Sequence, residues 1–366
     1  MTVLVAPLDW GLGHATRCIP IINELIKREL IVIIAASGSQ LDLLKQAFPA
    51  LEYLEIPGYK IRYKPGFLLK WSIFIQIPGI LLQIQRENRW LSRLISGRSI
   101  QAVISDNRYG LYHKKIFSVF ITHQLNILSG LGRKVDNLLF KMNQRRIQRF
   151  STCWVPDFEK DFSLAGILSH PVQQLSIPVK YIGILSRFSQ WERTIKKNTL
   201  LIILSGPEPQ RTHFENILFS QLINSNLQIV LVRGLPGSDH VIPFIHEGVK
   251  IFNHLRTEKL NELLSESDFI IARAGYSTIM DLVRLRRKAI LVPTPGQTEQ
   301  EYLGKRMVEK NWMITINENE FNLEAALKKL EKSKLNLPEI PASGFESSME
   351  ELITKCRGKI GKADHF

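Results

Sequence analysis

The sequence predicts an α/β protein with two Rossmann-like domains that face each other across a cleft, each a parallel sheet with helices on both faces. Its 366 residues exceed what one domain of ordinary size needs. Apolar, β-branched segments alternate with helical patterns along the whole chain, which is typical of parallel sheets with crossover helices. Most of these segments are apolar throughout, as strands buried on both faces are.

The order of these segments predicts the domain boundary. We expect strands at 3–6, 31–36, 102–105, 119–122, 153–155, 179–185, 200–205, 228–233, 249–252, 269–273 and 289–293. The polar stretch 186–198 has no strand pattern and separates two βα series. We therefore expect an N-terminal domain at 1–186, a C-terminal domain at 187–344, and a final helix within 345–366 that returns to the first domain.

The charge and the cysteines restrict the class of protein. The formal net charge is +14, and the excess is concentrated in the first half. A basic surface favours nucleic acid or an anionic membrane, but no zinc finger, RNP motif or KH loop occurs. Three scattered cysteines form no metal or disulfide pattern, and the N-terminus lacks the basic region of a signal peptide. We expect a cytoplasmic protein that does not bind nucleic acid.

Residues 59–84, YKIRYKPGFLLKWSIFIQIPGILLQI, combine basic and aromatic side chains with an apolar run. The run is too short and too polar for a spanning helix. Lys60, Arg62, Lys64 and Trp71 beside aliphatic residues suit the lipid headgroup boundary. One interpretation is a peripheral contact with an anionic membrane surface on the inner face of the cell membrane. The other is a buried helix preceded by a basic loop.

The segment 9–17, DWGLGHATR, directly follows the first predicted strand. Gly11 and Gly13 permit a tight turn and a close approach of backbone to ligand. His14 begins the next helix at the floor of the cleft, where an imidazole suits proton transfer. Arg17 lies one turn further on. The alternative interpretation is a capping histidine in a glycine turn.

Two more polar residues follow strands of the first domain. Asp106, in SDNRYG, would orient His14 or accept its charge, as an acid–base pair requires. Its alternative role is an Asx-type turn or helix cap. His123 either faces an acceptor or is a hydrogen-bonded structural histidine, and we favour the second.

Two turns of the second domain could bind an anion. In SGPEPQR, residues 205–211, two prolines each remove a backbone donor, which makes a poor phosphate cradle. The block 273–302 is stronger, because its Gly275 turn opens a helix with free amides and hydroxyls. Asp281 lies one turn further on, where a carboxylate can accept two bonds from a sugar diol. A second helix, with Gln300 and Glu301, would face the same cleft, and ordinary capping is the alternative.

These motifs resemble a known family. GxGHATR and the block RAGYST…D…PxPGQTEQEYL resemble GT-B glycosyltransferases of family 28. That family includes the bacterial enzyme that adds N-acetylglucosamine to lipid-linked muramyl peptide, and the plant galactolipid synthases. The resemblance implies transfer of a sugar from a nucleotide-sugar, foremost a UDP-sugar, to an acceptor hydroxyl. A lipid-linked acceptor or a cell-envelope glycan precursor fits the basic aromatic segment.

The resemblance also implies a mechanism. His14 would act as general base, or support catalysis, in a single inverting displacement. Retaining GT-B enzymes often carry two glutamates eight positions apart, whereas Arg273 stands eight residues before Asp281 here. No DxD-like carboxylate pair marks a metal site, so we expect neither metal nor cofactor.

The family's donor-binding residues carry over onto matching positions. Asp281 stands where the family usually has a glutamate that grips the ribose, and PEP replaces small residues in the loop after Gly206. By resemblance, the donor would contact Gly13, Ser205, Gly206, Asn253, His254, Arg273, Gly275, Tyr276, Ser277, Thr278, Asp281, Gln297, Gln300 and Glu301. The acceptor or membrane side would include Arg17, Lys60, Arg62, Lys64, Trp71 and His123.

Three other functions fit parts of the sequence. Nucleotide-sugar hydrolases of the sialic-acid-like sugar pathway share the fold and a GxGHxxR start, and their histidine activates water. The basic aromatic segment argues against a hydrolase, because water needs no docking surface. A nucleotide-sugar-binding protein without turnover and a basic nucleic-acid-binding protein are the remaining alternatives.

Overall fold

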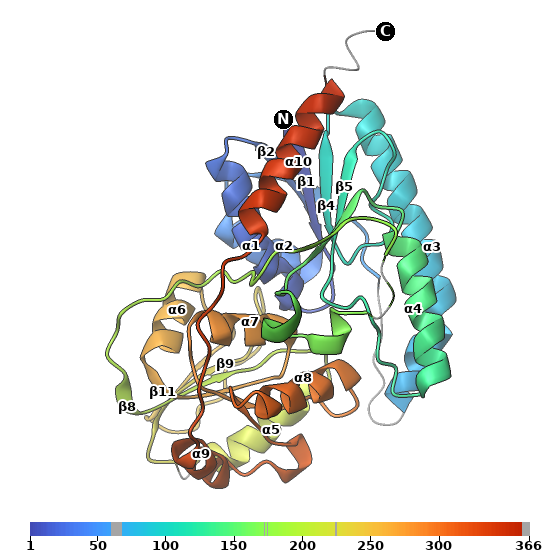
Figure 1. Cartoon of the computed structure of the whole chain (residues 1–366). Helices are drawn as coiled ribbons and strands as arrows, with labels where there is room; N and C mark the ends of the chain where they lie inside the picture. The colour runs from blue at the N-terminus through green and yellow to red at the C-terminus, as the bar shows by residue number, and fades with distance from the viewer. Residues whose placement is uncertain (60–67, 172, 174, 224, 361–366) are drawn as a thin grey trace.

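The structure, a computed structural model, describes residues 1–59, 68–171, 173, 175–223 and 225–360. This part of the chain forms two α/β domains, each built on one parallel sheet. Figure 1 shows the N-terminal domain above the C-terminal one. The fold class predicted from the alternation of apolar and helical segments is confirmed.

The first sheet has the strand order β3-β2-β1-β4-β5-β6-β7, and every pairing in it is parallel. Its strands are β1 Thr2–Pro7, β2 Ile31–Ala36, β3 Glu52–Glu55, β4 Ala102–Asp106, β5 Phe117–Ile121, β6 Thr152–Val155 and β7 Val179–Tyr181. The order changes direction at β1 and β4, so the loops after these two strands form the crevice where such sheets bind ligands.

The second sheet has the order β10-β9-β8-β11-β12-β13, again with parallel pairings. Its strands are β8 Lys196–Ile203, β9 Gln228–Val232, β10 Val249–Phe252, β11 Ser267–Ala272, β12 Ile290–Leu291 and β13 Ile314–Thr315. The switch point lies between β8 and β11. The loops after these strands are the SGPEPQR turn and the turn that contains Gly275.

Two strands, β3 and β13, were not predicted from the sequence, and the reason is physical. β3 lies at the sheet edge and reads EYLE, so it lacks an apolar run, and β13 has only two residues. The break expected at 186–198 is also partly wrong, because β8 begins at Lys196 within that polar stretch. Sheet pairing to Ser267, rather than burial, holds this exposed start.

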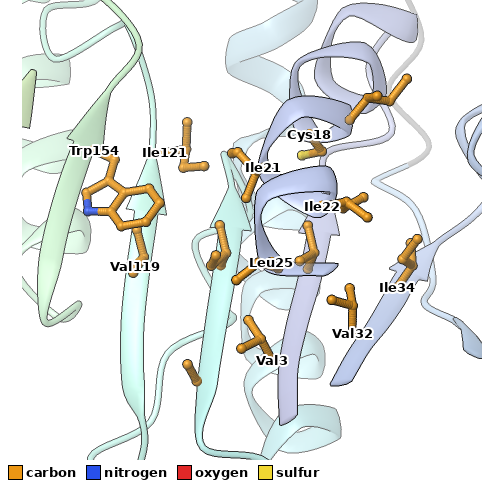
Figure 2. Packing of buried hydrophobic residues seen from close by; sticks show 14 of the residues in the cluster. Val3, Cys18, Ile21, Ile22, Leu25, Val32, Ile34, Val119, Ile121 and Trp154 are labelled. Carbon is orange, nitrogen blue, oxygen red and sulfur yellow. The ribbon is translucent and has the colours of Figure 1, made fainter. Parts of the chain in front are cut away.

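Helices cover both faces of the first sheet. The side chains of Val3 and Val5 share a core cluster with α1, whereas Leu4 lies in a cluster on the other face with Leu91 of α3. Figure 2 shows Ile22 and Leu25 of α1 packed among residues of the sheet. The helices are α1 Leu12–Lys27, α2 Gly38–Ala47, α3 Leu68–Gly97, α4 Arg133–Ile147, α5 Gln210–Leu222, α6 Thr257–Glu266, α7 Tyr276–Arg284, α8 Thr298–Glu309, α9 Leu323–Lys332 and α10 Phe345–Ile360.

The C-terminal helix α10 returns to the first domain, where Figure 1 shows it beside the upper sheet. Met349, Leu352 and Cys356 are buried in the core cluster that contains α1. The predicted boundary near residue 186 falls between β7 and β8. The exact extent of the two domains stays a prediction.

Helix α3 runs through Pro78 and Gly79 without a break. In the described part of the chain, no helix is both long enough and apolar enough to cross a membrane. Lys60, Arg62 and Lys64 lie outside the described residues, as does the side chain of Trp71. Membrane contact by the basic aromatic segment therefore stays a prediction.

The segment after β6 is tied together by one buried carboxylate. Asp157 accepts hydrogen bonds from the backbone amides of Phe158, Leu164 and Ala165 at 2.7–3.1 Å. Its Oδ2 also accepts from the hydroxyls of two serines, Ser163 and Ser169, at 2.7 and 2.6 Å. This packed segment gives α8 a surface on the first domain.

Arg306 and Tyr302 make the contacts of α8 with that segment. The Arg306 guanidinium donates to the carbonyls of Leu164 and Ser163, and the Tyr302 hydroxyl accepts from the amide of Ile167. Asp157 therefore shapes the interface between the domains as well as its own loop.

Replacing Asp157 with Ala should lower the free energy of unfolding by roughly 3 kcal/mol or more, because several buried donors lose their acceptor. Chemical denaturation of the full chain measures this. Asp161, exposed in the same segment, is the matched control, and its change to Ala should leave the midpoint nearly unchanged. Equal effects of the two variants would contradict the role of Asp157.

Candidate active site

A cavity of about 1250 Å³ lies between the domains. It is lined by the loops that follow β1, β4, β5, β8, β9 and β11, and by the N-terminal turn of α8. The volume exceeds that of an ordinary single-ligand pocket.

The loop after β1 places His14 at the floor of this cavity. Gly11 adopts φ 71°, which favours glycine, and its carbonyl accepts a hydrogen bond from the Gln40 amide at 3.1 Å. The buried Arg108 donates to the carbonyl of Pro7 at 2.7 Å. These contacts fix the path of the chain from β1 into α1.

Gly13 is needed for a close approach of the two domains. A Cβ at this position would lie 2.7 Å from the Ser277 hydroxyl oxygen, which donates to the Gly13 carbonyl at 3.1 Å. The first turns of α1 and α7 thus touch across the cavity. This contact sets His14 opposite the turn that begins at Gly275.

His14, Asp106 and Arg17 form a compact charge network. The Arg17 guanidinium grips both carboxylate oxygens of Asp106, with Nε 2.5 Å from Oδ2. His14 Nδ1 lies 3.0 Å from Asp106 Oδ1 and 2.7 Å from the Arg17 guanidinium. Only 15% of the His14 side chain is exposed, whereas Arg17 and Asp106 are buried. Arg17 therefore belongs to the network behind His14 as well as to the cavity wall.

Burial and charge set the protonation states. Burial lowers the pKa of His14, and the positive Arg17 lowers it further, although Asp106 partly opposes both. Burial alone would raise the pKa of Asp106, but Arg17 and His14 bring it to about 2. At neutral pH His14 is uncharged and Asp106 is ionised. An uncharged imidazole is the form that can accept a proton.

A second histidine links the two domains. His123 Nε2 lies 2.7 Å from Glu299 Oε1 on α8, and its ring stacks on Tyr276 of α7 with centroids 4.0 Å apart. The Tyr276 hydroxyl donates to the carbonyl of Pro156 at 2.7 Å. His123 is therefore hydrogen-bonded and also lines the cavity, and the choice between an acceptor contact and a structural role stays a prediction.

Three helix N-termini meet at the polar side of the cavity. The N-cap residues of α1, α7 and α8 are Gly11, Gly275 and Gln297, and none makes a side-chain cap hydrogen bond. Free amides and helix dipoles there favour an anion. At α5, by contrast, the Glu208 carboxylate accepts from the Thr212 amide at 3.2 Å, so that terminus already has a protein anion.

Part of the cavity lining is apolar. It is formed mainly by α3 and α4 of the first domain and the loop after β5. Its aliphatic side chains belong to Ile80, Leu81, Ile84, Ile127, Leu128, Leu139 and Met142. Arg146 supplies one positive charge on this wall. We call this surface the α3–α4 wall.

Besides Gly11, twelve of the residues singled out from the sequence line this cavity. They are Gly13, His14, Arg17, His123, Ser205, Gly206, Gly275, Tyr276, Ser277, Thr278, Gln297 and Gln300. Asp106 lies directly behind them, against His14 and Arg17. Their individual roles stay predictions.

Three residues expected to contact the donor make contacts within the protein, and their donor contacts stay predictions. The Asn253 amide donates to the carbonyls of Ser238 and His240 at 3.0 Å, so it shapes the loop after β9. Arg273 is buried against Glu318, 2.5 Å away. Glu301 accepts from the amide of Gly296 at 2.8 Å. None of the three lines the cavity.

Asp281 and His254 belong to a separate polar cluster at the interdomain linker. Asp281 Oδ1 accepts from the Ser186 hydroxyl at 2.5 Å. Burial raises the pKa of Asp281 to about 7, despite this hydrogen bond and the nearby Arg187. Burial and Arg187 lower the pKa of His254 to about 4. Neither side chain lines the main cavity, so a ribose contact by Asp281 stays a prediction.

Sequence reasoning missed Glu299 and the α3–α4 wall. Glu299 lies in the motif PTPGQTEQE, but the sequence does not show that its carboxylate pairs with His123 and Gln124 of the first domain. Leu139 and Met142 of α4 are spaced as a helix face, yet nothing in the sequence says what that face meets. Within the described residues, no group of three or more His, Cys, Asp or Glu side chains could hold a metal ion. Metal independence itself remains an expectation.

Comparison with known proteins finds glycosyltransferases among the proteins similar to this chain. Residues 211–355 match the family model described as the glycosyltransferase family 28 C-terminal domain. The solved structure of Acinetobacter baumannii MurG superposes with a TM-score of 0.51 over 98% of this chain and 94% of that chain, at 15% identity. Phytolacca americana UGT2, solved with UDP-2fluoro-glucose and pterostilbene, gives 0.61 over 98% and 93%, at 12% identity. These structures establish the GT-B fold.

Relatives found by sequence are also named as glycosyltransferases. A UDP-N-acetylglucosamine–N-acetylmuramyl-(pentapeptide) pyrophosphoryl-undecaprenol N-acetylglucosamine transferase of Prochlorococcus marinus is 25% identical over 37% of this chain, but the match spans only 38% of that relative. An uncharacterized glycosyltransferase of Methanosarcina acetivorans is 22% identical over 82% of both chains. The chain therefore has the GT-B fold, and its residues 211–355 are similar to the C-terminal domain of glycosyltransferase family 28.

Replacing Asp281 with Asn should stabilise the protein at high pH only. An unfolded aspartate ionises near pH 3.8, whereas the folded one keeps its proton to about pH 7, so ionisation opposes folding increasingly between these values. At pH 8 the Asn variant should exceed the wild type by about 2–4 kcal/mol, and at pH 3 the two should be equal. Denaturation at both pH values measures this, and a difference that does not change with pH would contradict the raised pKa.

Proposed function

We propose that the chain transfers a sugar from a nucleotide-sugar, most simply a UDP-sugar, to a hydroxyl group of a lipid-linked acceptor by an inverting displacement. The observation that carries the proposal is one cavity in which the His14–Asp106 pair faces the uncapped start of α7. An anionic leaving group and a base are the two requirements of such a transfer. A single cavity of about 1250 Å³ that contains both an imidazole and helix N-termini supports this proposal.

His14 acts as the general base in this proposal. His14 Nδ1 lies near Asp106 Oδ1, which only accepts, and near the Arg17 guanidinium, which only donates. In the tautomer that we propose, the Nδ1 proton is directed at Asp106 Oδ1, which leaves Nε2 with a free lone pair. Nε2 takes the proton of the acceptor hydroxyl as its oxygen attacks the anomeric carbon. The bond from that carbon to the diphosphate breaks, and the electron pair leaves with the nucleoside diphosphate.

The N-terminal amides of α7 and α8 stabilise the leaving diphosphate. These groups are fixed in the fold, so no reorganisation is needed as negative charge develops. The printed name of the Prochlorococcus relative specifies a UDP-N-acetylglucosamine donor, and UGT2 was solved with a UDP-sugar analogue. These names support UDP as the nucleotide.

The α3–α4 wall supports an acceptor with an apolar portion. A water-soluble sugar would leave these aliphatic side chains without a partner, whereas a lipid or polyprenyl chain would cover them. The name of the Prochlorococcus relative also contains a lipid carrier, pyrophosphoryl-undecaprenol. The proposal places the protein at the cytoplasmic face of the membrane as a peripheral enzyme of cell-envelope glycan synthesis.

Replacing His14 with Ala should lower kcat by about 100-fold or more, since general bases typically contribute that much. Binding of UDP should change little, because the amides of α7 and α8 remain. Sugar transfer to a lipid-linked acceptor and UDP binding by calorimetry measure the two effects. His213, exposed on α5 and absent from the cavity lining, is the control position for an Ala change.

Unchanged transfer in the His14 variant would remove this residue from the mechanism. Release of UDP from a UDP-sugar at full rate without any acceptor would instead favour the nucleotide-sugar hydrolase. Transfer that requires an acceptor excludes that alternative.

Replacing Leu139 with Asp should raise the KM for a lipid-linked acceptor roughly tenfold, because a charge on the α3–α4 wall opposes burial of an apolar chain. The KM for the nucleotide-sugar should stay the same. Leu138 is the matched control, since it is 57% exposed on α4 and does not line the cavity. If the Asp substitution has the same effect at both positions, the wall does not bind the acceptor.

A further inference from the structure

Glu299 carries a negative charge from the C-terminal domain into the charge network of the N-terminal domain. It lies in the first turn of α8, and both of its side-chain partners, His123 and Gln124, follow β5 in the other domain. The carboxylate lines the cavity. Burial opposes its ionisation, but His123, Arg17 and His14 together lower its pKa below the usual value. Glu299 is therefore an anion at neutral pH.

The hydrogen bonds connect Glu299 to the catalytic end of the network. A carboxylate only accepts, so His123 Nε2 carries a proton and donates to Glu299 over 2.7 Å. His123 Nδ1 is then an acceptor, and the Arg17 guanidinium lies 3.4 Å from it. Arg17 in turn grips Asp106, beside His14. The order Asp106, Arg17, His123, Glu299 runs from one domain to the other.

Arg17 thus lies between two carboxylates, one from each domain. Asp106 contacts it directly, and Glu299 acts through His123 and through its field, which helps to keep the guanidinium charged. The titratable groups that face His14 come from α1, β4, the loop after β5, α7 and α8. They are Arg17, Cys18, Asp106, His123, Tyr276 and Glu299.

We infer that Glu299 is a positioning residue for the proposed transfer: it balances the charge of Arg17 across the domain interface and thereby keeps His14 basic and aligned with Asp106. The inference rests on the proposed function and extends it beyond the His14–Asp106 pair. Without Glu299, only Asp106 opposes the charge of Arg17 next to His14. The imidazole then becomes a weaker base, and His123 loses the acceptor that fixes its ring.

The position of Glu299 makes the basicity of His14 depend on how the two domains pack. The balancing charge lies on α8, a helix of the predicted donor-binding domain, whereas the base lies on α1. His14 therefore has its full basicity only when α8 is docked on the first domain. Catalysis becomes coupled to the closed arrangement through electrostatics, in addition to substrate contacts.

The Glu299→Gln variant tests this, because Gln can still accept the hydrogen bond from His123 but carries no charge. Two readouts are measured on the full chain. One is the titration of the His14 imidazole by nitrogen-15 NMR, assigned with His14→Gln. The other is the pH profile of kcat with a UDP-sugar and a lipid-linked acceptor. Glu309→Gln, at an exposed carboxylate on the same helix, is the control.

We expect Glu299→Gln to move the His14 titration to lower pH and to lower kcat about tenfold, with the KM for the nucleotide-sugar changed less than about twofold. Glu299→Ala should move the titration in the same direction, and Glu309→Gln should match the wild type. A His14 titration that is unchanged in Glu299→Gln overturns the inference. The same holds if its kcat profile equals that of the wild type.

The two readouts separate this inference from the proposed function. The NMR titration requires no turnover. If the wild type transfers no sugar but Glu299→Gln still shifts the His14 titration, the proposed function fails and the electrostatic link stands. If the wild type transfers sugar and Glu299→Gln leaves both readouts unchanged, only the role of Glu299 fails.

Discussion

The contact between the first turns of α1 and α7 determines what the cavity can do. Because residue 13 is glycine, the Ser277 hydroxyl can reach its carbonyl, and the starts of both helices approach across the domain interface. The dipoles of α1, α7 and α8 then all point into the cavity. A helix start without a capping side chain attracts anions. His14, on α1, faces this electropositive region because the same contact fixes its distance from Gly275.

Around this contact, negative and positive side chains alternate in the order Asp106, Arg17 and Glu299. The buried Arg17 and Asp106 neutralise each other directly, as burial requires, and the partly exposed Glu299 adds a second negative charge near Arg17 through His123. The arrangement leaves His14 neutral, which suits a base. The linker cluster of Ser186 and Asp281 differs, because burial there outweighs the nearby cation and keeps the carboxyl protonated towards neutral pH. The two clusters show how burial and pairing set opposite protonation states within one interface.

Much of the fold and the cavity floor could be predicted from the sequence. Uniformly apolar strands gave both parallel sheets, and the GxGH turn located His14, since a turn after the first strand must lie at the switch point. β3 could not be predicted, because EYLE at an edge carries no burial signal. Asn253 and Arg273 were placed in the site by motif position, but their contacts with loop carbonyls and Glu318 depend on tertiary packing. Glu299 was missed because the sequence does not show which side chain of QTEQE pairs with His123 and Gln124 of the other domain.

The most direct test of this account is a crystal structure of the protein with a UDP-sugar bound. The account predicts the diphosphate at the N-terminal amides of α7, with the anomeric carbon turned towards His14 Nε2 and space for an alcohol between them. A diphosphate bound away from the Gly275 turn would contradict it. So would an imidazole whose Nε2 points into the protein rather than into the cavity.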